Sequence, residues 1–187
     1  RRKCFQGAVG FGLSALAYNR VARAAAKGPL VSVGFVGCGG RAKGLRSAFR
    51  DEADVRWACD PDRNRLDEFR AAMKSDGAKS STDLRDLMDD KSLDAVVIAT
   101  PDHWHAPAAI MACDAGKHVY VEKPCSHNFR EGQWLVDAAR RNQSVVQHGT
   151  QSRSNPAIAS AIAAIQDGLI GDVLMCKAWN VQRRRNI

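Results

Sequence analysis

A glycine-rich turn between a β-type run and a helix-compatible segment constrains the fold of this chain more than any other feature. Residues 30–36 are rich in apolar and β-branched side chains, and Gly37-Cys38-Gly39-Gly40-Arg41-Ala42 follows with the spacing G-x-G-x-x-A. Glycine suits such a turn because a side chain would hinder its backbone conformation and would keep a ligand away from the main chain. The pattern predicts a strand, a phosphate-binding turn and a helix that begins near Gly40.

Asp60 indicates which ligand the turn binds. It ends the next predicted strand, 23 residues after Gly37, where an acid about 20 residues beyond the glycines accepts hydrogen bonds from the ribose of a dinucleotide. The helix N-terminus offers N–H groups and partial positive charge to the pyrophosphate. A carboxylate repels a 2′-phosphate, so NAD is favoured, while Arg41 and Arg63 keep NADP possible. In the alternative interpretation, Asp60 caps a helix in another kind of α/β protein.

The order of the predicted elements indicates an α/β fold with a doubly wound parallel sheet, that is, a Rossmann domain over residues 31–152. The predicted strands lie at 30–36, 54–59, 94–99, 118–121 and 144–147, and the predicted helices at 40–50, 63–74, 83–88, 107–115 and 128–141. Ser81 or Thr82 is expected to cap the third helix. A helix at 157–166 and a strand at 173–179 are interpreted as the truncated start of a C-terminal α/β substrate domain, residues 153–187.

Polar residues gather where the predicted strands end, and in a doubly wound sheet these ends border the ligand crevice. The cofactor-binding residues predicted from this placement are Gly37, Cys38, Gly39, Gly40, Arg41, Asp60, Thr100, Pro101, His103, Glu122, Lys123 and Gln147. Lys123 and His105 are the predicted catalytic residues. A surface lysine and a structural histidine that caps the next helix are the competing interpretations.

Together these residues resemble the glucose–fructose oxidoreductase / inositol dehydrogenase family (Gfo/Idh/MocA). The resemblance runs from about Val31 to Trp179. Besides the glycine turn and Asp60, it rests on Ala99-Thr100-Pro101-Asp102-His103-Trp104-His105, on Glu122-Lys123-Pro124 after Gly116-Lys117-His118-Val119, and on Gly168-Leu169-Ile170-Gly171-Asp172-Val173. The Asp-His-Trp-His run and Gln147-His148-Gly149-Thr150-Gln151 resemble a secreted bacterial branch.

The resemblance implies an NAD(P)-dependent oxidoreductase that acts on CH–OH groups of a sugar or polyol. It implies that Lys123 lies beside the nicotinamide and the reacting hydroxyl, that further catalytic groups come from the second domain, and that the whole protein is a homo-oligomer. An ammonium group there could orient the hydroxyl and stabilise its developing charge, and Glu122 would position Lys123 or the ribose. Two alternatives stay open: an NAD-dependent glycosidase that oxidises the sugar transiently, and a non-catalytic NAD-binding module.

Charge and composition exclude other classes of function. The net charge of +8 arises at the ends, because residues 1–30 carry six basic and no acidic side chains and residues 183–185 add three arginines, which leaves −1 between them. We therefore expect no nucleic-acid binding. No apolar run reaches the roughly 18 residues of a membrane span. The six cysteines show no C-x-x-C spacing, so no metal site is expected and they are interpreted as small buried hydrophobes.

Residues 1–30 have the layout of an export signal. Arg1-Arg2-Lys3 precedes an apolar stretch, Ala8 to Ala17, and small residues around Ala24 and Ala26. The paired arginines resemble a twin-arginine signal, which predicts a periplasmic protein; the alternative, an amphipathic first helix, would leave it cytoplasmic. The start without methionine and the abrupt end at Ile187 lead us to expect a fragment of a longer protein, inactive without its substrate domain.

Overall fold

The computed structural model describes residues 30–49, 53–73 and 75–179. Apart from Leu30, the expected export segment lies outside the described residues. The chain divides into two units between Gly149 and Thr150, and each unit is described here by itself. None of the described helices is both long and apolar enough to span a membrane.

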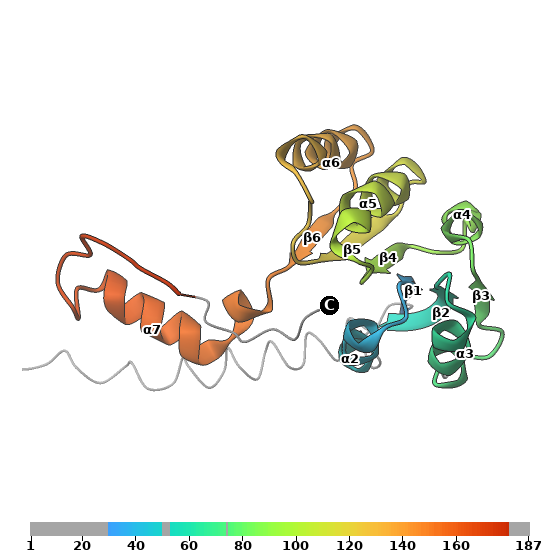
Figure 1. The fold of residues 1–187 in the computed structure, drawn as a ribbon, viewed down its shortest axis with the longest axis horizontal. Coiled ribbons are helices and arrows are strands. Elements are labelled where there is room, and N and C mark those ends of the chain that lie inside the picture. The colour runs from blue at the N-terminus through green and yellow to red at the C-terminus, as the bar shows by residue number, and fades with distance from the viewer. Residues whose placement is uncertain (1–29, 50–52, 74, 180–187) are drawn as a thin grey trace, which may run out of the picture. The chain divides into compact units, whose positions relative to one another are not determined.

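The first unit is built on a parallel sheet of six strands (Figure 1). The strands are β1 (Val31–Val36), β2 (Ala53–Cys59), β3 (Lys79–Ser81), β4 (Ala95–Ile98), β5 (His118–Glu122) and β6 (Val146–Gly149). Their order is β3-β2-β1-β4-β5-β6, and each neighbouring pair is parallel. This is the strand order of a Rossmann domain, so the predicted fold is confirmed. The winding direction reverses between β1 and β4, which places a ligand crevice beyond the carboxyl ends of these two strands.

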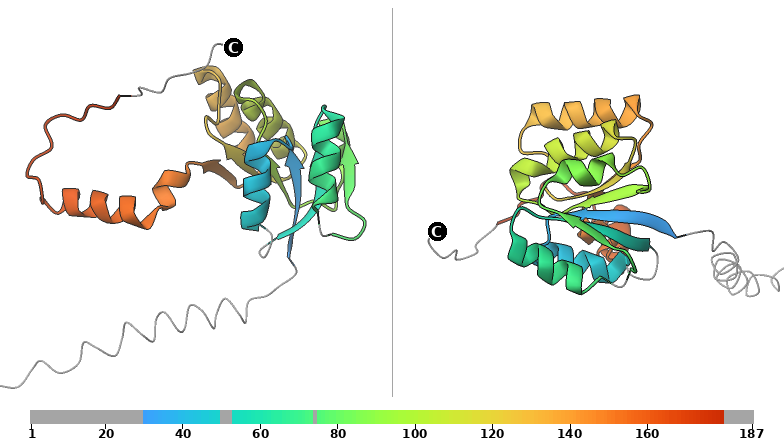
Figure 2. Two further views of the ribbon diagram at one scale, coloured as in Figure 1. Left: turned by 60° about the horizontal axis from the view of Figure 1, so that its bottom comes forward. Right: turned by 90° about the vertical axis from the view of Figure 1, so that its right-hand side faces the viewer.

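Helices cover both faces of the sheet (Figure 2). On one face lie α2 (Gly40–Phe49) and α3 (Arg63–Ala71). On the other lie α4 (Leu84–Asp89), α5 (His105–Asp114) and α6 (Phe129–Arg141). Because both faces are covered, the central strands are apolar without polar alternation, and residues 32–36 of β1 are all buried.

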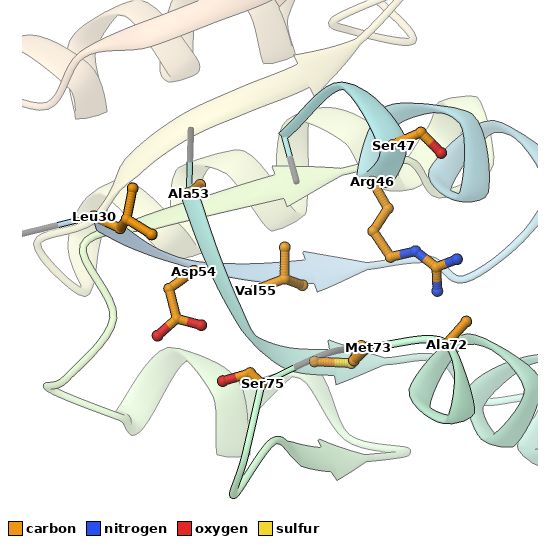
Figure 3. A pocket seen from close by; sticks show the side chains of 9 residues that line it. All are labelled: Leu30, Arg46, Ser47, Ala53, Asp54, Val55, Ala72, Met73 and Ser75. Carbon is orange, nitrogen blue, oxygen red and sulfur yellow. The ribbon is translucent and has the colours of Figure 1, made fainter. Parts of the chain in front are cut away.

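A cavity of about 280 Å³ opens near the amino ends of β1 and β2 (Figure 3). It is lined by Leu30, Arg46, Ser47, Ala53, Asp54, Val55, Ala72, Met73 and Ser75. Arg46 has a structural role here, since its guanidinium donates to the carbonyl oxygen of Phe69 at 2.9 Å and lies over the Phe69 ring. None of the predicted site residues lines this cavity.

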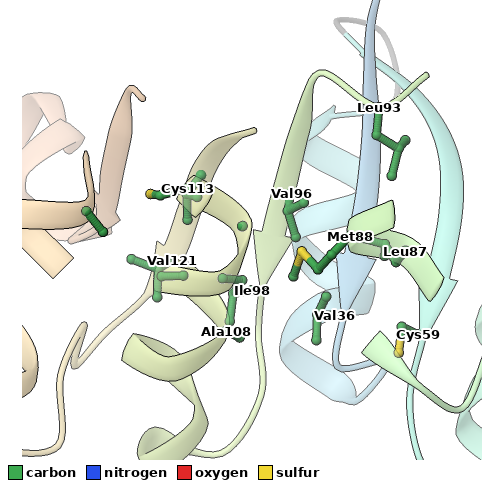
Figure 4. Close-up of a cluster of buried hydrophobic side chains, with 14 of the residues drawn as sticks. Val36, Cys59, Leu87, Met88, Leu93, Val96, Ile98, Ala108, Cys113 and Val121 are labelled. Atoms are coloured by element: carbon green, nitrogen blue, oxygen red, sulfur yellow. The ribbon is translucent and has the colours of Figure 1, made fainter. Parts of the chain in front are cut away.

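Two apolar cores hold the helices against the sheet. The core under α2 and α3 includes Phe35 and Phe69, whose ring centroids lie 5.2 Å apart. The core under α4, α5 and α6 joins strand residues such as Val96 and Ile98 to Leu87 of α4 and Ala108 of α5 (Figure 4). Each large side chain buried in this way stabilises the fold by about 1.5–3 kcal/mol.

The structure corrects several predicted boundaries in the first unit. β3 was not predicted, because a strand of three residues leaves almost no periodic signal. The N-cap of α4 is Asp83, whose carboxylate accepts from the Arg85 N–H, and not Ser81 or Thr82. β6 begins two residues later than predicted and ends at Gly149, so Gln147 lies within the strand and not at its end.

The helix after β4 also begins earlier than predicted. A short 3-10 turn, η1 (Asp102–Trp104), runs directly into α5, whose first residue is His105. Pro107 lies within the first turn of this helix, where its missing N–H costs nothing. His105 therefore belongs to the helix and does not precede it.

The second unit contains a 3-10 turn, η2 (Gln151–Ser154), and the helix α7 (Pro156–Gln166). Asn155 caps α7 by accepting from the N–H groups of Ala157 and Ile158. The strand predicted at 173–179 is absent from the described residues. A strand forms when a neighbouring segment pairs with its N–H and C=O groups, and the described part of this unit supplies no such neighbour.

The prediction that the cysteines are buried is confirmed for three of them. Cys38, Cys59 and Cys113 are buried, whereas Cys125 is half-buried, Cys176 is exposed and Cys4 lies outside the described residues. Burial and the nearby Asp60 raise the pKa of the Cys38 thiol to about 12, and the same two causes raise the pKa of Cys59 to about 12. These two thiols stay neutral at ordinary pH and behave as small hydrophobes.

Candidate cofactor and catalytic site

The glycine turn packs tightly against the ends of two strands. Gly37 has φ +87°, and a Cβ at this position would lie 2.7 Å from both the carbonyl carbon and the oxygen of Ala99. Its N–H donates to the carbonyl oxygen of Cys59 at 2.8 Å. Both the positive φ and the contact with Ala99 therefore require glycine at position 37.

The opposite side of the turn is open. A Cβ on Gly39 or Gly40 would meet nothing within 4 Å. The first N–H groups of α2 have no partner within the helix, and they carry the positive end of the helix dipole. Bare main chain, unpaired donors and open space fit the pyrophosphate of a dinucleotide.

Asp60 is fixed by the main chain beside this turn. Asp60 is buried, with 6% of its surface exposed. One of its carboxylate oxygens accepts a hydrogen bond from the N–H of Cys38 at 2.7 Å. The other oxygen accepts from the N–H of Asp62 at 2.9 Å. The N–H of Cys38 is thus engaged by Asp60 and not directed to a phosphate. Each carboxylate oxygen keeps a second lone pair, which can accept from a ribose hydroxyl.

A cleft of about 910 Å³ extends from the glycine turn along the ends of β1, β2 and β4. This volume lies within the roughly 300–1,000 Å³ of ligand pockets. Among the predicted site residues, the cleft is lined by Gly37, Gly39, Gly40, Arg41, Asp60, Thr100, Pro101 and His103. The buried hydroxyl oxygen of Thr100 has no hydrogen-bond partner within the described part of the chain, as expected of a wall that receives a polar ligand.

Sequence reasoning missed one wall of this cleft. Its residues follow the unpredicted strand β3 or begin the neighbouring helices, and they are Asp62, Arg65, Thr82, Asp83, Leu84, Arg85 and Trp104. Arg65 and Arg85 are paired with Asp62 and Asp83 across 3.3 and 2.5 Å, so this wall carries balanced charge. Recognition of β3 would have indicated Thr82 and Asp83, which follow its carboxyl end directly.

Lys123 borders a second, smaller pocket of about 230 Å³ at the ends of β4 and β5. Arg41, Ala99 and Thr100 line both this pocket and the larger cleft. The two cavities therefore adjoin, and Lys123 is an exposed residue that lines the smaller one.

Glu122 anchors the backbone just before Lys123. One carboxylate oxygen accepts from Arg41 at 2.5 Å and from the Tyr120 hydroxyl at 3.3 Å, and the other accepts from the N–H of Lys123 at 3.3 Å. Burial opposes the charge on Glu122, but the hydrogen bond and the charge of Arg41 outweigh it and lower the pKa of this carboxyl. Glu122 is accordingly ionised and held in place.

The remaining predicted site residues have different surroundings. His105 is buried, and both of its ring nitrogens lie within hydrogen-bond distance of main-chain carbonyls. His103 is exposed at the cleft. Gln147 is exposed on β6, where its amide donates to the carbonyl oxygen of His148, and it is not among the residues that line either cavity.

The fold and the site are those of a dinucleotide-binding domain. Residues 31–150 match the oxidoreductase family GFO_IDH_MocA, described as an NAD-binding Rossmann fold. The chain belongs to this Gfo/Idh/MocA family, and its cofactor is NAD.

Individual relatives agree with this assignment. Levoglucosan dehydrogenase of Pseudarthrobacter phenanthrenivorans is 36% identical over 112 residues, which are 60% of this chain and 29% of that protein. A glycosyl hydrolase family 109 protein of Shewanella pealeana is 30% identical over 83% of this chain and 36% of its own length. The WlbA dehydrogenase of Bordetella pertussis, solved in complex with NADH and UDP-GlcNAcA, is 30% identical with a TM-score of 0.68, over 74% of this chain and 40% of that one. The chain thus spans well under half the length of these relatives.

Proposed function

We propose that the whole protein transfers hydride between NAD and a CH–OH group of a sugar or polyol, with Lys123 as the catalytic residue of this domain. The observation that carries the proposal is the pocket of Lys123, which shares Arg41, Ala99 and Thr100 with the dinucleotide cleft. An ammonium group at this position would act on a substrate next to the reactive end of the cofactor. The dehydrogenases among the relatives support the same reaction class.

The residues of the chain supply binding and orientation, while NAD supplies the hydride acceptor or donor. The N-terminus of α2 would hold the pyrophosphate and Asp60 the ribose. The Lys123 ammonium would hydrogen-bond the substrate oxygen and stabilise the negative charge that develops on it as its proton leaves. The proposal is tested by incubating the whole protein with NAD and a panel of sugars and polyols. NADH formation would support it, and a failure to reduce NAD with any member of the panel would contradict it.

The glycosyl hydrolase family 109 relative favours a second candidate, an NAD-dependent glycosidase. Such an enzyme would oxidise the sugar, eliminate the glycosidic substituent, add water and reduce the sugar again, so the bound NAD is regenerated in each cycle. The two candidates share this domain and differ in net chemistry. Release of an aglycone from aryl glycosides without net NADH would identify the glycosidase.

We also propose, from sequence, that residues 1–30 direct export through the twin-arginine route and that the whole protein is a homo-oligomer. The acid-free basic start and the apolar stretch after it support export. A reporter fused after residue 30 should reach the periplasm, and replacement of Arg1 and Arg2 by lysine should stop it. Sedimentation of the whole protein tests the oligomer.

A further inference from the structure

His105 joins two loops of the candidate site. It begins α5, and only 2% of its surface is exposed. Its Nδ1 atom lies 2.5 Å from the carbonyl oxygen of Pro124, and its Nε2 atom lies 2.9 Å from the carbonyl oxygen of Thr100. Pro124 follows Lys123 at the end of β5, and Thr100 follows β4. One imidazole ring, which itself lines the small pocket, therefore contacts the main chain after β4 and after β5.

These contacts are unlike those of a proton-transferring group. A general base needs a ring nitrogen within hydrogen-bond reach of the substrate proton. Both nitrogens of His105 face main-chain carbonyls instead, and the buried ring sits in the first turn of a helix. A neutral imidazole carries one N–H, so the ring donates to one of these two carbonyl oxygens, and the tautomer decides which one.

Lys123 lies between two anchored neighbours. Glu122 is tied to Arg41 of α2 and to the N–H of Lys123 itself. Pro124 is tied through its carbonyl oxygen to His105 of α5. Helices on opposite faces of the sheet thus fix the backbone before and after the lysine.

We propose that His105 is a positioning residue, which clamps the loops of Thr100 and Pro124 so that the Lys123 ammonium points into the pocket. This role rests on the proposed function of Lys123 and replaces the catalytic role predicted for His105 from sequence. A change at His105 should therefore disturb the position of the Lys123 side chain and leave the affinity for the cofactor unchanged.

Three substitutions separate the two links. His105→Phe keeps the flat shape of the ring and removes both ring nitrogens, and with them any hydrogen bond to Thr100 or Pro124. His105→Asn places an amide near the Nδ1 position and can keep the link to Pro124, and His105→Gln places one near Nε2 and can keep the link to Thr100. In the whole protein we expect kcat to fall by up to about 100-fold for His105→Phe, the loss produced by a misplacement of about 1 Å. His105→Asn should retain more activity than His105→Gln, since Pro124 adjoins the lysine.

Two further measurements distinguish positioning from other roles. The Kd for NADH should stay near the wild-type value in all three variants, and the pH profile of kcat should keep its shape. Loss of one limb of that profile in His105→Phe would overturn the proposal in favour of proton transfer, and an equal loss of NADH affinity and kcat would overturn it in favour of general structural damage. His118→Asn, at the exposed start of β5, is the histidine control and should behave as wild type.

Hydrogen exchange tests the clamp without any turnover. Amides in residues 99–104 and 122–127 should exchange faster in His105→Phe than in the wild type, whereas those of β1 should not change. If the amides of both loops exchanged at the same rates in His105→Phe as in the wild type, the proposed clamp would be wrong. A wild-type protein that binds NADH but turns over no substrate would contradict the proposed function of Lys123, and the exchange result would still decide the role of His105.

Discussion

Arg41 and Glu122 lie 81 positions apart in sequence, and their side chains form an ion pair in which Nη2 and Oε1 are 2.5 Å apart. Arg41 belongs to the first turn of α2, directly after the glycine turn, and Glu122 ends β5 directly before Lys123. The pair therefore links the two ends of the candidate site. The Glu122 side chain is 4% exposed, so the carboxylate of this pair is shielded from solvent.

Acid should weaken the fold through Glu122. The folded-state pKa of this carboxyl is lowered, so its stabilising effect is complete above the unfolded-state pKa and is lost as the pH falls through the lowered value. Glu122→Gln should lower the free energy of unfolding at pH 7 by about 1–3 kcal/mol. The free energy of unfolding of Glu122→Gln should also fall less steeply with acid than that of the wild type. Urea unfolding at a series of pH values measures both effects.

Glu68→Gln is the matched control for this prediction. Glu68 pairs with Lys43 at 2.6 Å, but its side chain is 66% exposed, and surface pairs contribute little. The control should unfold like the wild type at each pH. Equal pH dependence in Glu122→Gln and the wild type would mean that the Arg41 pair does not stabilise the fold.

Gly37→Ala should destabilise the domain and abolish NADH binding. A positive φ at a residue with a side chain costs about 1–3 kcal/mol, and the contact of the new Cβ with Ala99 adds to this cost. Gly77→Ala provides the comparison, since Gly77 has φ +80° with no atom within 4 Å of its Cβ position. Thermal unfolding and NADH fluorescence should show the larger loss at Gly37. Equal destabilisation, with NADH binding retained in both, would exclude a role for the close approach.

Asp60→Asn should reduce NADH affinity and narrow the preference for NADH over NADPH. The two carboxylate oxygens accept from different main-chain N–H groups, and an amide has only one acceptor oxygen. The amide therefore offers the ribose hydroxyls fewer acceptors, and loss of one hydrogen bond to the ribose, about 1.4 kcal/mol, corresponds to a tenfold weaker Kd. Calorimetric titration with both nucleotides measures the change, with Asp67→Asn on the exposed face of α3 as the control. An unchanged preference would show that Asp60 does not discriminate between them.

Lys123→Ala should lower kcat by about 10²–10³-fold, the loss that follows removal of one donor to a developing oxyanion. The Kd for NADH should change little, because the residues proposed to hold the pyrophosphate and the ribose line the larger cleft and Lys123 does not. Stopped-flow kinetics of the whole protein with its substrate, beside NADH titration, separates the two effects. Lys91→Ala, in an exposed turn, is the control. If Lys123→Ala turned over substrate like the wild type, the non-catalytic interpretation of this domain would gain support.

The fold could be predicted from sequence because its signals are local. The run of apolar residues before Gly37, the glycine spacing and the acid at position 60 each report a backbone requirement within a short stretch of chain. Five of the six strands were predicted on this basis, and β3 was missed because three residues carry too little pattern. The boundaries of β6 and α5 shifted because pairing and packing with distant segments, and not local propensity, decide where such elements begin.

Sequence by itself thus determined the parallel α/β fold, the position of the glycine turn and the choice of Lys123 as the residue to test. The tertiary structure decided how these parts meet. It brought Arg41 to Glu122, tied His105 to the carbonyls of Thr100 and Pro124, turned the N–H of Cys38 toward Asp60, and left Gln147 away from both cavities. Hydrogen bonds between residues far apart in the chain depend on the path of the backbone through space, which no spacing along the sequence records.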